Sequence, residues 1–149
     1  MQPSLLIKNR DDLKAAASEI LAEIKDKDSA GALVVALSGD LGAGKTSFTQ
    51  CAAEVLGIAR PVRSPTSVIM ESYDINWGRF HKFIHIDAYR LENEHELVSL
   101  DWLGLSADHS NFVFVEWPGK IANIIPSDAV RLNFLHVDHN TREIVFPES

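Results

Sequence analysis

This chain of 149 residues lacks most features that mark secreted or membrane-spanning proteins. Its single cysteine, Cys51, cannot form an internal disulfide, which is typical of proteins from a reducing compartment. No apolar run approaches the roughly 20 residues of a transmembrane helix. The N-terminus also shows no basic segment followed by a long apolar one. We therefore expect a cytoplasmic protein without a signal peptide or membrane contact.

Positive charge is also scarce. The chain has 14 lysines and arginines against 21 aspartates and glutamates, a formal net charge of −7. Broad, non-specific nucleic-acid binding needs a basic face, so the acidic net charge argues against such binding. Contact with RNA through a partner protein is compatible with this charge. The apolar fraction of 46%, with no internal repeat, predicts a single ordinary globular domain over residues 1–149.

The most informative feature of the sequence is the segment Gly39–Thr46, which reads G-D-L-G-A-G-K-T after the apolar run 32–37. It matches the phosphate-binding loop pattern between a strand and a helix. Glycines allow a tight turn that points backbone N–H groups at phosphate oxygens, and the following helix adds its positive end. Lys45 would reach the β- and γ-phosphates of a nucleotide, and Thr46 would bind Mg²⁺. The predicted phosphate-binding residues are Asp40, Leu41, Gly42, Ala43, Gly44, Lys45 and Thr46.

Apolar periodicity predicts the remaining elements. We expect strands at 4–8, 32–37, 68–73, 79–86, 112–115, 130–137 and 143–146, with a hairpin turn over 74–78. We expect helices after Asn9, after the loop, over 92–103 with Gly104 as its end, and over 118–124. The order predicts an α/β fold, a P-loop NTPase-like three-layer sandwich whose mixed sheet has parallel central strands.

Two acidic residues follow apolar strands. Asp87 ends one strand and Glu116 ends another, and ligands of such sheets gather at the carboxyl ends of the strands. Either acid could hold Mg²⁺ or position an attacking water. We favour Glu116 as the metal ligand because its strand is the more fully apolar.

Other residues leave two interpretations open. Ser64–Thr66 lies where GTPases carry a switch segment, so Thr66 could sense a γ-phosphate, or the segment could be a plain Ser-Pro turn. Trp117 could gate the site or pack in the core. The six histidines lack partners for a tetrahedral zinc site, so we interpret them as surface or core residues.

Four motifs together resemble one family. They are Gly39–Thr46, Ser64–Thr66, the H-I-D-A-Y-R-L of 85–91 and the E-W-P of 116–118. Their order and spacing are similar to the TsaE family, formerly YjeE, small bacterial ATPases required for threonylcarbamoyl modification of tRNA adenosine. Three positions depart from the usual family pattern, Ser67, Ala88 and Gly119, and none carries an assigned chemical role.

The resemblance implies a P-loop ATPase that uses ATP and Mg²⁺ and works with the partners TsaD and TsaB, meeting tRNA only through that complex. It implies that Thr46 and Glu116 bind Mg²⁺ and that Asp87 lies near metal and phosphates. Lys45, Asp87 and Thr66 are then the candidate catalytic residues. The N-terminal segment and last strands of the family suggest that adenine meets Arg10, Asp11 and Arg142.

Two alternatives remain at this point. A small-molecule P-loop kinase would also carry the loop, although such kinases normally have an arginine-rich lid that this chain lacks. A nucleotide-dependent binding switch with negligible catalysis would need the same phosphate site without the hydrolytic machinery.

Overall fold

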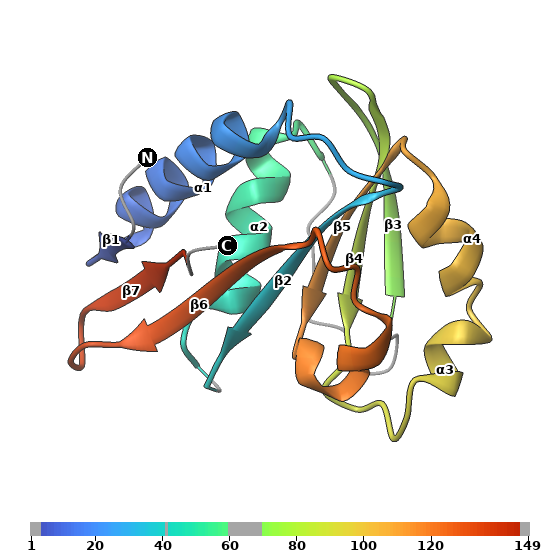
Figure 1. The fold of residues 1–149 in the computed structure, drawn as a ribbon. Coiled ribbons are helices and arrows are strands. Elements are labelled where there is room, and N and C mark those ends of the chain that lie inside the picture. Colours follow the sequence, from blue (N-terminus) through green and yellow to red (C-terminus); the bar gives the residue numbers. More distant parts are fainter. Residues whose placement is uncertain (1–3, 41, 60–69, 147–149) are drawn as a thin grey trace.

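The computed structural model describes residues 4–40, 42–59 and 70–146, which form a mixed seven-stranded sheet with helices on both faces (Figure 1). The strands are β1 (Ser4–Ile7), β2 (Leu33–Gly39), β3 (Met70–Trp77), β4 (Phe80–Asp87), β5 (Asn111–Glu116), β6 (Val130–His136) and β7 (Arg142–Val145). The helices are α1 (Arg10–Ile24), α2 (Lys45–Val55), α3 (His95–Val98), α4 (Trp102–Ala107) and the 3₁₀ helix η1 (Pro118–Ile124). None of the helices described is long and apolar enough to cross a membrane.

The strand order β1-β7-β6-β2-β5-β4-β3 confirms the predicted fold class. β4, β5, β2 and β6 run parallel at the centre, and antiparallel pairs join β3 to β4, β6 to β7 and β7 to β1. Every residue of β5 and the first five of β2 are buried. A strand covered on both faces needs no polar alternation, which explains the unbroken apolar runs in the sequence.

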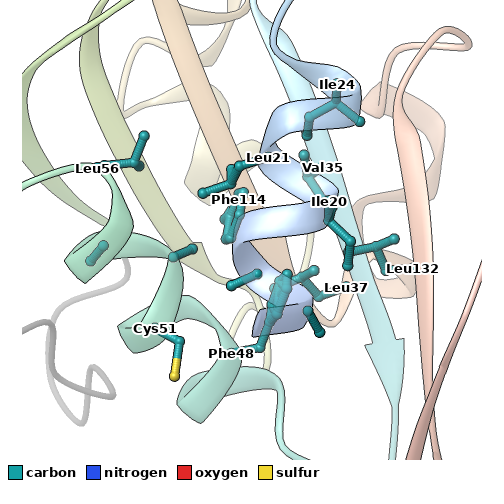
Figure 2. Close-up of a cluster of buried hydrophobic side chains, with 14 of the residues drawn as sticks. Ile20, Leu21, Ile24, Val35, Leu37, Phe48, Cys51, Leu56, Phe114 and Leu132 are labelled. Carbon is teal, nitrogen blue, oxygen red and sulfur yellow. The ribbon is translucent and has the colours of Figure 1, made fainter. Parts of the chain in front are cut away.

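The larger core lies between the sheet and the helix pair α1 and α2, as Figure 2 shows. Asn9 caps α1 by accepting the N–H of Asp12 at 2.8 Å, so the helix begins where its apolar stripe can face the sheet. On α2, the Phe48 ring stacks on Phe114 of β5 and meets the edge of Phe134 of β6. These contacts set the position of α2, and with it the end of the preceding loop, on the sheet.

Figure 1 places α3 and α4 beside the opposite face of the sheet. Leu97, Trp102 and Ile121 pack there against apolar residues of β2, β4 and β5. The two cores on either side of one sheet are the predicted three layers.

The predicted single helix over 92–103, with Gly104 as its end, is wrong in its continuity and in its end. The chain forms two short helices, because Asp101 adopts a left-handed conformation (φ 65°) between α3 and α4. Gly104 lies inside α4 and does not end it, and an added Cβ there would lie 2.8 Å from the Asp101 carboxylate. Leu97 and Trp102 both reach the same core, but they are five residues apart and do so from separate helices. Aspartate tolerates the left-handed region better than most residues, which permits the break.

The predicted hairpin turn over 74–78 is too long. β3 continues to Trp77, and only Gly78 and Arg79 separate it from β4. The register shifts between Asp74 and Trp77, so an irregularity in the strand replaces the longer loop. The Trp77 ring packs against the core with its centroid 4.9 Å from that of Phe112, and this contact favours continued pairing over an open turn. Residues 68 and 69 of the predicted strand lie outside the described residues.

Candidate phosphate and metal site

Three parallel strands end at one edge of the sheet, next to the start of α2. Glu116 of β5 pairs in register with Leu37 of β2 on one side and with Asp87 of β4 on the other. Alternation along the strands places Glu116 and Asp87 on the face covered by α2, since Phe114 and Phe83, two and four residues earlier, belong to that core. The sheet therefore brings both predicted acids to the loop at Gly39.

The loop needs glycine for its backbone conformation. Gly42 and Gly44 have φ values of 76° and 105°, which L side chains rarely adopt, although an added Cβ would meet nothing within 4 Å at either position. Gly44 is the N-cap of α2 and has no side chain to bond the first-turn N–H groups. Those donors suit an anion at the helix start. Leu41, a predicted phosphate contact, lies outside the described residues.

Lys45 is buried at the first position of α2. Its ammonium donates a hydrogen bond to the carbonyl oxygen of Gly39 and lies 3.3 Å from the centroid of the Trp117 ring. Burial lowers the pKa of Lys45, while the nearby carboxylates of Glu116 and Asp87 oppose that shift. The ammonium thus lies between the carbonyl oxygen of Gly39 and the face of the Trp117 ring, near two carboxylates.

Glu116 is almost fully buried, with 2% of the residue exposed, and each of its carboxylate oxygens has a partner. Oε1 accepts a hydrogen bond from the Thr46 hydroxyl at 3.0 Å. Oε2 lies 2.5 Å from Nε2 of His85, a fully buried residue of β4. The structure therefore joins the two predicted metal ligands, Thr46 and Glu116, in one contact.

His85 is a site residue that the sequence analysis did not identify. The sequence predicts a surface or core histidine at this position, the first of the motif 85–91, and the structure shows a core residue that contacts Glu116. The signal was its position two residues before Asp87, because residues at that spacing share a strand face. What the sequence did not show is that β4 pairs directly with β5.

Asp87 lies half-buried beside Glu116 and accepts the N–H of Tyr89 at 3.0 Å. Burial raises the pKa of Asp87, the Tyr89 N–H lowers it, and the neighbouring Glu116 carboxylate raises it further. The Tyr89 ring packs 5.0 Å from that of Trp117, whose backbone has a left-handed φ of 60°. Trp117 therefore lies between Tyr89 and Lys45 at the mouth of the site, partly exposed and packed against the core that also holds Trp102.

The donor set fits a metal that arrives with a nucleotide. Across the described residues, no group of three or more His, Cys, Asp or Glu side chains is placed to hold a metal ion. The Thr46 hydroxyl and the Glu116 carboxylate are hard oxygen donors of the kind Mg²⁺ takes. Two protein ligands suffice for Mg²⁺ when phosphates and water complete its octahedron.

The predicted adenine contacts differ in their surroundings. Arg142 meets the loop, since its Nε donates to the carbonyl oxygen of Gly42 at 3.4 Å. Arg10 forms an ion pair with Glu54 at 2.8 Å. Glu54 follows Lys45 by nine residues of α2, a distance of about 13 Å along the helix, so Arg10 lies away from the loop. Asp11 is exposed in the first turn of α1. Thr66 and the rest of the predicted switch, Ser64–Thr66, lie outside the described residues.

Comparisons with known proteins show the family of this chain. A family model described as threonylcarbamoyl adenosine biosynthesis protein TsaE matches residues 7–144. The chain is 38% identical over 139 residues to the TsaE protein of Bacillus subtilis, across 93% of this chain and 80% of that protein. It is 43% identical over 105 residues to the TsaE protein of Streptomyces coelicolor, across 69% of this chain and 68% of that protein. The crystal structure of Bacillus subtilis YdiB superposes with a TM-score of 0.67 at 29% identity, over 96% of this chain and 82% of that chain. With the loop, its two acids and these matches in agreement, the chain belongs to the TsaE family of threonylcarbamoyl adenosine biosynthesis proteins.

Proposed function

We propose that this protein is a partner-stimulated ATPase. It binds Mg·ATP at Gly39–Thr46 and supports threonylcarbamoylation of the tRNA adenosine next to the anticodon by the TsaB–TsaD complex. The observation that carries the proposal is the 3.0 Å contact between Thr46, at the end of the loop, and Glu116, at the end of β5. A loop hydroxyl and a strand-end carboxylate are the pair with which P-loop enzymes hold nucleotide-bound Mg²⁺.

The site residues divide the work of binding. Backbone N–H groups of the loop and of the α2 N-terminus receive phosphate oxygens, and Lys45 supplies the full positive charge. Thr46 and Glu116 hold the metal, which neutralises charge between the β- and γ-phosphates when bound. Arg142 is the predicted adenine contact best placed to act, because it already touches the loop at Gly42.

Asp87 supplies a second carboxylate on the strand next to Glu116. The side chains of Thr46 and His85 hold the Glu116 carboxylate, whereas Asp87 accepts the backbone N–H of Tyr89. Its raised pKa and its position at the end of β4 suit a group that orients water near the γ-phosphate. Phosphoryl transfer in this class depends mostly on positioning and charge stabilisation, and an arginine from a partner can add a factor of roughly 10³ or more. Slow hydrolysis by the isolated chain and acceleration by TsaB and TsaD follow from this reasoning.

The first experiment measures nucleotide affinity by calorimetry. Lys45→Ala removes the charge that faces the phosphates and should weaken ATP binding by about 2–4 kcal/mol. Lys14→Ala is the matched control, since Lys14 is an exposed lysine of α1 near Glu54. Unchanged ATP affinity and turnover in Lys45→Ala would contradict the proposal.

The second experiment measures ATP turnover with and without the TsaB–TsaD complex. We expect slow turnover alone, a large increase with both partners, and a smaller increase for Thr66→Ala. Fast hydrolysis that partners leave unchanged would contradict partner stimulation and favour the kinase alternative. Nucleotide binding without turnover under either condition would favour the binding switch.

A further inference from the structure

We propose that His85 is a positioning residue that fixes the Glu116 carboxylate for the nucleotide-bound metal. The inference rests on the proposed function, because it concerns how the chain prepares its metal ligand. His85 would not touch metal or nucleotide. It would act by holding Oε2 of Glu116, so that Oε1 stays beside Thr46.

The contact between His85 and Glu116 has a definite polarity. Nε2 of the ring lies 2.5 Å from Oε2 of the carboxylate, and the histidine is fully buried. A carboxylate that binds a metal is ionised and only accepts hydrogen bonds, so in a metal-binding state Nε2 would be the donor of this contact. The two carboxylate oxygens thus have separate partners, His85 on one side and Thr46 on the other, and rotation of the group would break both bonds.

Strand pairing explains why His85 reaches this oxygen. Asp87 pairs in register with Glu116, and His85 lies two residues earlier on β4, on the same face of the sheet. Two residues along a strand span about 6.6 Å, so His85 is one layer deeper than Asp87 beneath the loop. From there it meets the Glu116 carboxylate from the core side, while Thr46 meets it from the loop side.

A role in core packing alone does not explain why residue 85 is a histidine. Within the described part of the chain, its Nδ1 is buried without a hydrogen-bond partner, which makes this side chain costly in a core. Phe83, two residues earlier, shows that an apolar ring fits the same face of the strand. Among the residues that the structure describes, Glu116 is the polar partner of the imidazole. Buried polar partners of this kind orient metal ligands, and losing one typically weakens metal binding about 10- to 100-fold.

The test measures metal affinity without turnover, using ADP as the probe. The Mg²⁺ concentration at half-saturation is measured by titration at fixed ADP, and ADP affinity is measured separately in EDTA. His85→Leu should raise the Mg²⁺ half-saturation on the order of tenfold or more and leave ADP affinity in EDTA unchanged. His85→Gln, whose amide nitrogen can replace Nε2 as donor, should recover most of the loss.

Two further variants separate positioning from packing. Phe83→Leu alters the same core face without touching Glu116, so it should lower the melting temperature and leave the Mg²⁺ half-saturation unchanged. In a Glu116→Gln background, His85→Leu should add little, because the group it positions is already altered.

The outcomes distinguish this inference from the proposed function. If the wild type binds ADP with Mg²⁺ dependence and both His85 variants match it, the inference is wrong and the nucleotide site stands. Equal losses with and without Mg²⁺ would assign His85 to packing and also overturn it. A wild type that binds no ADP would overturn the proposed function, and the inference with it.

Discussion

The ammonium of Lys45 lies 3.3 Å from the centroid of the Trp117 ring while it donates a hydrogen bond to the carbonyl oxygen of Gly39. The relationship is a cation–π contact at the mouth of the phosphate site. Trp117 reaches this position through a left-handed backbone (φ 60°) directly after the buried Glu116. Phosphates that bind Lys45 would compete with both contacts, so nucleotide binding and the surroundings of Trp117 are coupled.

The first prediction is that Mg·ADP changes tryptophan emission through Trp117. Displacing a cation from the ring face alters the environment of the indole, and Trp117 is half-exposed. A fluorescence titration should show a saturable change that Trp117→Phe largely abolishes, since Lys45 of the loop meets Trp117, whereas the lysine near Trp77 is Lys25 of the chain after α1. The same change in Trp117→Phe would show that another tryptophan reports binding.

The second prediction separates the two acids by metal dependence. Glu116→Gln keeps the shape of the side chain and removes its charge, so Mg²⁺-dependent turnover should fall about 10²-fold or more while the fold survives. Asp87→Asn should reduce turnover with a smaller effect on the Mg²⁺ concentration required. Steady-state rates across a Mg²⁺ series check both. Loss of Mg²⁺ dependence in Asp87→Asn alone would reverse the assignment.

The third prediction concerns the thiol of Cys51. Cys51 is a fully buried residue of α2, and burial raises the pKa of its thiol, so little thiolate forms near neutral pH. A colorimetric thiol reagent should label the native protein on the order of 10²-fold more slowly than the denatured chain, which should yield one thiol per molecule. Rapid labelling of the native protein would show that α2 opens readily.

The fourth prediction tests a close backbone approach. A Cβ added to Gly31 would lie 2.3 Å from the carbonyl oxygen of Ser106, a backbone atom that cannot move away alone. Gly31→Ala should lower the free energy of unfolding by about 1–3 kcal/mol, measured by denaturant titration. Gly119→Ala is the matched control, because its added Cβ would meet nothing within 4 Å. Equal stability of the two variants would contradict the close approach.

Local patterns were enough to predict several features of this protein. The loop Gly39–Thr46 is contiguous, and its chemistry depends on residue types at fixed spacing, so it could be identified before any fold was known. Unbroken apolar runs in the sequence predicted the buried strands β2 and β5. Asp87 and Glu116 were predicted because a polar residue that ends such a strand lies at the ligand-binding edge of the sheet.

Other features depended on neighbours that spacing does not encode. The break at Asp101 was not predicted because residues 92–103 contain neither glycine nor proline, the usual signals of a helix end. Leu97 and Trp102 enter the same core from two helices. β3 continues through most of the predicted turn to Trp77, because the Trp77 ring packs against Phe112 of the core. In both cases tertiary packing outweighed the local preference of the chain.

The sequence by itself determined that this protein carries the pattern of a phosphate-binding loop and two strand-end acids in an α/β sheet. Only the tertiary structure decided which groups those acids meet. His85 and Glu116 are 31 residues apart and come together because β4 pairs in parallel with β5. Lys45 meets Trp117 because β2 and β5 end side by side and the chain turns sharply after Glu116. Contacts of this kind arise from strand pairing across the sheet, and residue spacing along the chain does not contain them.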